Sequence, residues 1–328
     1  MPDLKTTYMG IPLRSPIVVG ASSVSAMVDK IKMAEQAGAG ALVIRSLFEE
    51  QIKFDTLRLE ESLSVGAESQ PEARTYFPNI KHGEAKEHLM WVEKARKAVA
   101  FPLLASLNAV TPGAWTKYAR QLEETGINGL ELNVYSVAAD TRRAGTAIEK
   151  ELYEAVEAVR QQVKIPLAVK LSPFYTSVAN VAAELDKRGA ASLVLFNRFL
   201  QPDIDPATES PTSEMVLSGP EELRLPLRWT GLLYGRIKAE IALSTGVHSG
   251  LDAAKALLAG ATVVQTASAV IKHGLPYVST MLRQLEEWMT EKGYASIAEF
   301  RGKLSQKQAA DPSAFERAQY VRLLLAQK

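Results

Sequence analysis

The chain has 328 residues, of which 47% are hydrophobic, enough for one large α/β domain or two ordinary ones around a substantial core. Its 38 lysines and arginines nearly balance 37 aspartates and glutamates, so no basic field favours binding to nucleic acid or to an anionic membrane. It has no cysteines, which excludes disulfides, thiolate nucleophiles and cysteine-ligated metal sites within the chain.

The sequence contains neither an apolar signal segment at its start nor a run of the roughly 18 apolar residues that a membrane span requires. No His-x-x-x-His pair or acidic cluster predicts a metal site. We therefore expect a cytoplasmic protein that binds no metal, no nucleic acid and no membrane.

Short apolar runs alternate with helical patterns along the chain, which is typical of repeated strand–helix units. Strands are predicted at residues 16–20, 41–45, 102–107, 129–134, 166–171, 192–196, 240–244 and 262–266. The helices between them are predicted to begin near Ser25, Lys86, Pro112, Thr146, Val178, Gly219 and Ser249, and a further helix is predicted at 276–292.

This order of elements fits a closed (β/α)8 TIM barrel, with a doubly wound open sheet as the alternative. No Gly-x-Gly-x-x-Gly follows the first strand, so the dinucleotide fingerprint that would favour the open sheet is missing. We predict one barrel domain over residues 1–304 and a helical extension over 305–328 that lies outside the barrel.

Two connections are too long for routine loops between a strand and a helix. Residues 47–85 are rich in charge, and we expect them to form a functional loop or lid over the carboxyl-terminal face of the barrel. Residues 198–218 contain Pro202, Pro206 and Pro211 and form a second long connection above the sixth strand.

Polar residues end two neighbouring strands, where barrel enzymes keep their chemistry. Lys170 can face the pyrimidine edge of a flavin and stabilise negative charge on the reduced ring, or it can reach solvent from the strand rim. Asn133 can bind the same ring or a substrate, or it can form a turn. Ser136 follows on the loop, within reach of whatever lies over the barrel mouth.

The seventh and eighth units carry Thr245-Gly246 and Ala267-Ser268 just after their strands. In barrels these two loops commonly hold a phosphate through backbone N–H groups and a helix amino terminus. The alternative is an ordinary glycine turn followed by a helix cap at Ser249.

Taken together, these segments resemble the dihydroorotate dehydrogenase family of FMN-dependent barrel enzymes, especially its soluble class 1 branch. The resemblance covers most of residues 4–304, and it rests on the order and spacing of several modest motifs. The motifs are Ser15-Pro16, Glu131-Leu-Asn133, Val169-Lys170-Leu171, Leu217-Ser218-Gly219-Pro220, Thr245-Gly246-Val247, Leu258-Ala-Gly260-Ala261, Gly293-Tyr294-x-Ser296-Ile297 and Gly302-Lys303-Leu304.

The resemblance implies an FMN cofactor and assigns its contacts. The ring would be contacted by Gly20, Ala21 and Ser22, with Asn133 and Lys170 along its polar edge. The phosphate would lie between Thr245-Gly246 and Ala267-Ser268, with Gly219 near the ribityl chain. Arg45, Asn133 and Asn197 would orient flavin or substrate.

The resemblance also implies the reaction, which is oxidation of dihydroorotate to orotate in pyrimidine biosynthesis. In the family a base removes a proton while hydride passes to flavin N5, and a second electron acceptor, such as fumarate or a quinone, then reoxidises the flavin. Ser136 falls on the position of the base, which is cysteine in class 1 and serine in the membrane-associated class. The class 1 resemblance further implies a homodimer.

Several positions depart from the family pattern for orotate. Ala138 replaces the motif's second asparagine, Arg45 replaces a lysine, and Arg198 follows Asn197 where a small hydroxyl residue is usual. Each lost hydrogen-bonding partner costs roughly 1 to 3 kcal/mol of binding free energy. The alternatives are therefore an FMN oxidoreductase for another cyclic dihydropyrimidine or an enoyl substrate, and a flavin-binding protein without efficient turnover.

Overall fold

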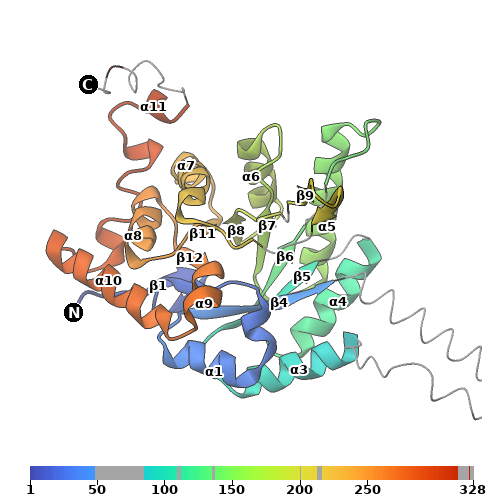
Figure 1. Cartoon of the computed structure of the whole chain (residues 1–328), viewed down its shortest axis with the longest axis horizontal. Helices are drawn as coiled ribbons and strands as arrows, with labels where there is room; N and C mark the ends of the chain where they lie inside the picture. The colour runs from blue at the N-terminus through green and yellow to red at the C-terminus, as the bar shows by residue number, and fades with distance from the viewer. Residues whose placement is uncertain are drawn as a thin grey trace, which may run out of the picture.

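The computed structural model describes residues 1–48, 85–108, 112–134, 137–199, 201–212, 216–316 and residue 325. The predicted strands are present as β3 (Ile17–Val19), β4 (Ala41–Phe48), β5 (Leu103–Asn108), β6 (Gly129–Asn133), β7 (Leu167–Leu171), β8 (Ser192–Leu195), β11 (Glu240–Ser244) and β12 (Val263–Thr266). They form a closed barrel in the order β11-β12-β3-β4-β5-β6-β7-β8, and all neighbours in it are parallel (Figure 1). The predicted TIM barrel is confirmed, and the open sheet is excluded.

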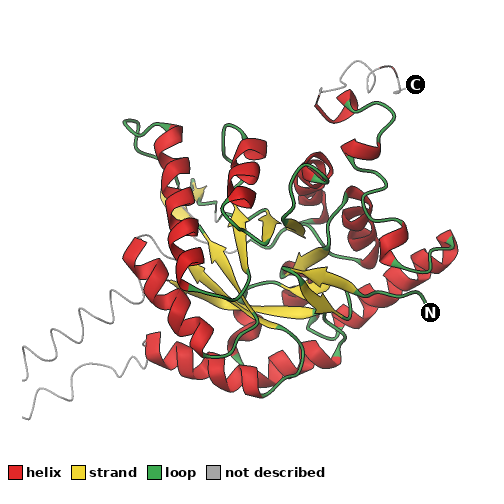
Figure 2. Cartoon of the chain, turned by 180° about the vertical axis from the view of Figure 1, so that it is seen from behind, coloured by secondary structure: helices red, strands yellow, loops and turns green. Residues whose placement is uncertain are grey.

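Helices surround the barrel on its outside (Figure 2). They are α1 (Val28–Gln36), α3 (Ala85–Lys97), α4 (Pro112–Glu124), α5 (Gly145–Gln162), α6 (Val178–Lys187), α7 (Arg224–Leu233), α8 (Gly250–Ala259) and α10 (Tyr277–Lys292). The predicted starts agree closely except near Gly219, where the 3-10 turn η3 (Pro220–Leu223) precedes α7. None of the helices in the described ranges is long and apolar enough to cross a membrane.

The strands divide their side chains between two hydrophobic clusters because successive residues of a strand point to opposite faces. Val18, Val43, Leu104 and Ala168 belong to the cluster inside the barrel. Their chain neighbours, such as Leu42 and Val169, belong to the larger cluster that packs against the helices. The same alternation directs the polar residues near the carboxyl ends of the strands into the barrel mouth.

A hairpin that the sequence analysis did not predict closes the amino-terminal end of the barrel. Its strands are β1 (Thr6–Tyr8) and β2 (Ile11–Leu13), and its Tyr8 and Met9 join the interior cluster. The Thr6 hydroxyl donates to the carbonyl of Thr262, 2.9 Å away, just before β12. The amino-terminal segment is therefore part of the barrel core.

The remaining elements are short and are not among the barrel strands. A hairpin of β9 (Asp203–Asp205) and β10 (Ser210–Thr212) lies in the predicted connection at 198–218. The others are α9 (Ser268–His273), η1 (Ser23–Ala26), η4 (Ile297–Glu299), η5 (Gln306–Gln308) and α11 (Ser313–Glu316). Most of the predicted lid at 47–85 lies outside the described residues, as does most of the tail beyond 316.

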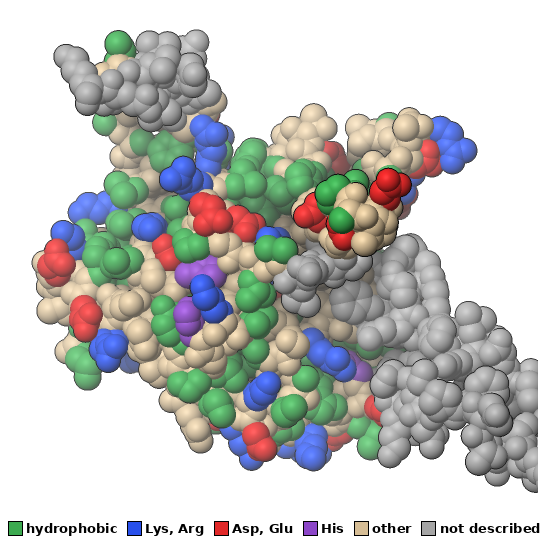
Figure 3. All heavy atoms as spheres, viewed as in Figure 1, with side chains coloured by type: hydrophobic (Ala, Val, Ile, Leu, Met, Phe, Trp, Pro, Cys, Tyr) green, Lys and Arg blue, Asp and Glu red, His purple; other side chains and the backbone are tan. Residues whose placement is uncertain are grey.

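Charges of both signs are interspersed over the face of the molecule seen in Figure 3. This distribution agrees with the near balance of 38 basic and 37 acidic residues in the chain. No long-range field of one sign is expected over this face, because neighbouring charges of opposite sign offset one another. Salt also screens exposed charges beyond about 10 Å.

His88 on α3 is a buried ionisable residue outside the barrel, only 7% exposed. Burial, and secondarily the charge of Arg45, lower its pKa to about 4 from the ordinary value of about 6.5. As the pH falls, the unfolded chain therefore takes up this proton before the folded chain does. Stability is lost between about pH 6.5 and pH 4, and the loss levels off below that window.

We predict that His88→Gln flattens the acid side of the stability profile. The wild type should lose about 1.4 kcal/mol of unfolding free energy per pH unit in this window relative to the variant. Urea unfolding at several pH values measures the slope, with His273→Gln at an exposed position as the matched control. Equal slopes for wild type and His88→Gln would contradict the assignment.

Candidate active site

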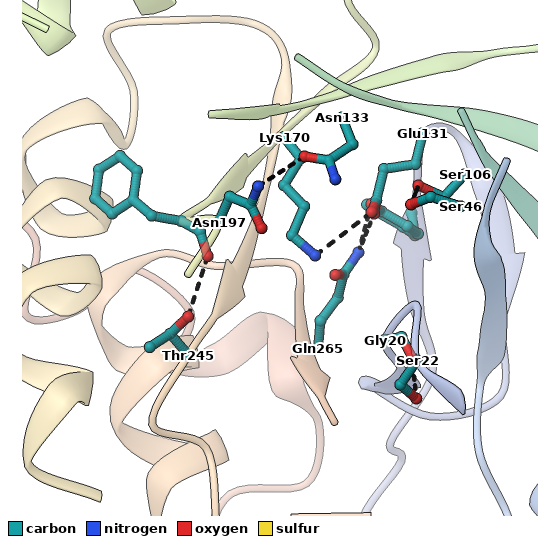
Figure 4. Close-up of polar contacts among 12 residues, drawn as sticks. Gly20, Ser22, Ser46, Ser106, Glu131, Asn133, Lys170, Asn197, Thr245 and Gln265 are labelled. Carbon is teal, nitrogen blue, oxygen red and sulfur yellow. Dashed lines mark hydrogen bonds and ion pairs between the residues drawn. The ribbon is translucent and has the colours of Figure 1, made fainter. Parts of the chain in front are cut away.

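Polar side chains from three strands converge inside the barrel just below its carboxyl-terminal mouth (Figure 4). Glu131 and Asn133 come from β6, Lys170 from β7 and Gln265 from β12. Lys170 pairs in register with Asn133, so these two side chains lie at one level of the barrel. Glu131 lies two residues earlier on its strand, one level further into the barrel.

The structure joins Asn133 to the predicted Asn197, which follows β8. Nδ2 of Asn197 donates to Oδ1 of Asn133 at 2.8 Å, and the backbone N–H of Asn197 donates to the carbonyl of Leu171 at 2.7 Å. Nδ2 of Asn133 and Oδ1 of Asn197 have no hydrogen bond to another described residue. The pair thus offers one donor group and one acceptor to a ring above the barrel.

Glu131 and Gln265 are the members of the cluster to which the sequence analysis assigned no role. Glu131 is 0% exposed, and its Oε1 lies 3.6 Å from Nζ of Lys170. Nε2 of Gln265 donates to its Oε2 at 2.6 Å and also to the hydroxyl of Tyr8 at 3.2 Å. Burial, and then the charge of Glu131, raise the pKa of Tyr8 well above its usual value.

A sequence signal for Glu131 existed, because an acidic residue inside an apolar strand needs a partner. The lysine on the next strand, Lys170, was the candidate. Gln265 gave no comparable signal, since β12 lies opposite β6 in the closed barrel and 134 residues separate the two side chains.

The predicted phosphate loops meet where β11 and β12 end. Thr245 and Gly246 have φ values of 78° and 77°, so two successive residues lie in the left-handed region. A Cβ on Gly246 would lie 2.3 Å from the backbone nitrogen of Leu223, and only glycine permits this approach. The Thr266 hydroxyl donates to the Val247 carbonyl at 3.0 Å, which ties the two loops together.

The segment that contains Gly219 reaches the same place. The hydroxyl of Ser218 donates to that of Ser268 at 2.8 Å, and the backbone N–H of Ser218 donates to it at 3.1 Å. Ser249 also caps α8, since its hydroxyl accepts from the N–H of Asp252. The loop therefore includes the helix cap that was the alternative interpretation, and it brings the predicted phosphate residues together as well.

The loop after β3 lies beside Gln265. The N–H of Gly20 donates to the Thr266 carbonyl at 2.9 Å, and a Cβ on Gly20 would lie 3.7 Å from Oε1 of Gln265. That oxygen is buried and has no hydrogen-bond partner in the described part of the chain. Ser22 donates to the carbonyl of Gly20 at 3.1 Å, which shapes the turn through Ala21.

Arg45 is not joined to this cluster, and Ser136 cannot be placed. Arg45 is exposed and lies at a shift in the β4–β5 register, and it makes no side-chain hydrogen bond with another described residue. Its neighbour Ser46 instead contacts Ser106, with the two hydroxyl oxygens 2.8 Å apart. Ser136 lies outside the described residues, so its position relative to Lys170 stays a prediction.

Arg198, which departs from the family pattern, makes contacts within its own connection. Its Nε donates to Oε2 of Glu222 at 2.9 Å, and its NH1 group donates to the carbonyl of Val216. Glu222 also accepts from the N–H of Gly219 at 2.9 Å. The arginine thus tethers the segment that carries Gly219.

A pocket with a volume of about 1070 Å³ lies beside the mouth, at the ends of β6 and β7. Val134, Ala138 and Ser172 are among the residues that line it. Phe174 and Phe199 line its outer part, with ring centroids 5.5 Å apart. The lining also includes the charged residues Arg143, Glu149, Glu151 and Glu154, so the pocket has both apolar and charged walls.

The closed barrel with polar groups and glycine loops at its mouth has the architecture of a (β/α)8 barrel enzyme. The sequence profile of the dihydroorotate dehydrogenase family matches residues 3–289. The chain belongs to the dihydroorotate dehydrogenase family, as the motifs predicted, and is an oxidoreductase that acts on a CH–CH bond.

Curated relatives cover nearly the whole chain at modest identity. The catalytic subunit of dihydroorotate dehydrogenase B (NAD+) from Thermoplasma volcanium is 27% identical, covering 92% of this chain and 98% of the relative. Dihydroorotate dehydrogenase A (fumarate) from Lactococcus lactis subsp. cremoris is 26% identical, covering 92% and 99%. The chloroplastic dihydropyrimidine dehydrogenase (NADP+) of Arabidopsis thaliana is 23% identical, covering 92% and 76%.

We predict that Gly246→Ala destabilises the protein by about 1 to 3 kcal/mol, because alanine is strained at this φ and its Cβ would meet the backbone. The matched control is Gly113→Ala at an exposed position on α4, where the added Cβ meets nothing within 4 Å. The control should be neutral or gain up to about 1 kcal/mol. Urea unfolding compares the two, and equal stabilities would contradict the strained geometry.

Proposed function

We propose that the chain binds FMN and oxidises (S)-dihydroorotate to orotate in pyrimidine biosynthesis. The observation that carries the proposal is the meeting of Lys170, Asn133 and Asn197 at the mouth of a barrel whose family match spans residues 3–289. A cation and two amides at one level suit a planar ring with polar edges, which both the flavin and the substrate possess.

The residues present fit a flavin. When bound, FMN supplies the acceptor for a hydride. Lys170 brings a positive charge to the polar edge of the ring, where it stabilises negative charge on the reduced cofactor. The unpaired Oε1 of Gln265 faces Gly20 as an acceptor for an N–H group. The glycine turns at Gly246 and Gly219 let the backbone approach a phosphate.

Asn133 and Asn197 orient the substrate in this proposal. Their mutual hydrogen bond fixes both amides, so the Asn133 donor and the Asn197 acceptor, which bond no other described residue, point in set directions. Ser136 is the proposed base that takes a proton from the substrate. A free hydroxyl is a weak base, so the proton must leave through a relay or an oriented water.

A second candidate function keeps the flavin chemistry and changes the substrate to another cyclic dihydropyrimidine or an enoyl compound. The observation in its favour is the pocket of about 1070 Å³ that Ala138 lines, at the position where the family pattern has an asparagine. The name of the Arabidopsis relative, dihydropyrimidine dehydrogenase, points to the same class of substrate. A flavin-binding protein without efficient turnover is the third possibility.

The proposal also requires a second electron acceptor, because each turnover leaves two electrons on the cofactor. The relatives' names include NAD+ and fumarate. The predicted homodimer and cytoplasmic location stay predictions from the sequence.

Anaerobic addition of substrate to the FMN-loaded protein separates these functions. We expect dihydroorotate to bleach the absorption band of the oxidised flavin within one turnover. Dihydrouracil is the matched probe because it has the same ring without the carboxylate. Bleaching by dihydrouracil alone would favour the second candidate, and a flavin that neither compound reduces would favour the third.

Ser136→Ala should slow flavin reduction by roughly 10² to 10⁴-fold, the usual contribution of a general base. Bound FMN should be unchanged, since the serine is assigned to the substrate side. Stopped-flow absorbance gives the rate, and Ser279→Ala on α10 is the control for the same chemical change elsewhere. A wild-type rate in Ser136→Ala would remove the serine from the mechanism.

A further inference from the structure

We infer that Glu131 is a positioning residue that holds the Lys170 ammonium inside the barrel mouth and offsets part of its charge. It thereby sets how strongly the site prefers reduced to oxidised flavin. The inference rests on the proposed binding of FMN and assigns the regulation of its potential to a residue that does not touch the reacting atoms.

The burial of Glu131 requires a partner. The residue is 0% exposed, and an isolated carboxylate in such a place would take up a proton or destabilise the fold. Within the described ranges, Lys170 is the cation that forms an ion pair with it. Gln265 is the neutral donor to its other oxygen. The buried carboxylate group thus has one cationic partner and one neutral donor among the described residues.

The distance between Lys170 and Glu131 leaves the N–H groups of the lysine available to bind a ligand. Nζ of Lys170 lies 3.6 Å from Oε1 of Glu131, beyond the 2.7–2.9 Å that is usual for a charge-assisted hydrogen bond. The side chain of Lys170 is only 12% exposed, and no hydrogen bond joins its Nζ to another described residue. The ammonium is thus attracted and oriented by Glu131 while its N–H groups can still donate to a ligand at the mouth.

Gln265 fixes the carboxylate from the opposite side of the barrel. The two hydrogens of its Nε2 are directed to Oε2 of Glu131 and to the Tyr8 hydroxyl. A flipped amide would place its oxygen against the carboxylate, so these contacts determine the orientation. Glu131 therefore cannot turn away from Lys170 without breaking a 2.6 Å hydrogen bond across the barrel.

The sign of the effect follows from the charges. With the pair intact, Lys170 and Glu131 together carry no net charge beside the flavin. In Glu131→Gln the ammonium loses its opposing carboxylate, so a negative charge on reduced flavin is favoured more strongly.

The test measures FMN affinity and midpoint potential of the holoenzyme by fluorescence titration and by equilibration with a redox dye. Glu131→Gln should increase the affinity for reduced relative to oxidised FMN by about tenfold, which is about 30 mV more positive for a two-electron couple. The matched control is Glu240→Gln at the amino-terminal end of β11, and it should keep the wild-type potential.

A double variant distinguishes positioning from a merely structural role. In Lys170→Met the ammonium through which Glu131 is proposed to act is absent, so adding Glu131→Gln should change the potential little. Glu131→Asp keeps the charge but moves it away from Nζ, and we expect an intermediate potential. If Glu131→Gln does not fold, the potential of Glu131→Asp tests the role of Glu131 instead.

The outcomes separate the two proposals. Wild-type protein that binds FMN, together with a wild-type potential in Glu131→Gln or, if that variant does not fold, in Glu131→Asp, overturns the role of Glu131 and leaves the proposed function standing. Equal shifts from Glu131→Gln with and without Lys170 also overturn it, because the effect would not pass through the lysine. Wild-type protein that binds no FMN overturns both.

Discussion

The structure depends on one constraint, which is that a carboxylate placed inside the barrel must be paired. Glu131 satisfies it with a lysine from the adjacent strand and an amide from the strand opposite. The same amide contacts Tyr8 of the amino-terminal hairpin. One buried acidic group therefore links three strands and the amino-terminal hairpin. These contacts hold Lys170 in a set position at the barrel mouth, in register with Asn133.

Most of the barrel was predictable because local signals agree with the global fold. The run from Pro166 to Leu171 is apolar and is bounded by a proline and a polar turn, and it became β7 with Lys170 in the mouth. Asn133 was predicted as a ligand because it ends a buried strand, and Asn197 because of the family resemblance. The strands that precede them flank β7, and the two side chains lie 2.8 Å apart. A residue at the carboxyl end of a barrel strand can be placed at the barrel mouth from the sequence alone.

What the sequence could not show depends on closure or on very short elements. The strands of the amino-terminal hairpin have three residues each, too few for a periodic pattern, so the sequence analysis did not predict this hairpin. The contact between Glu131 and Gln265 joins residues 134 apart and exists only when the sheet closes. The register shift at Arg45 is a local irregularity, and it left that side chain exposed rather than in the cluster.

The bond across the barrel also bears on how the chain reaches its native state. Gln265 lies on the last strand in sequence, and β12 pairs with β3, the first strand of the barrel. Until that strand is synthesised and docked, Glu131 and Tyr8 lack the amide donor that Gln265 supplies. The hydrogen bond between Glu131 and Gln265 therefore couples completion of this buried site to the docking of the final strand.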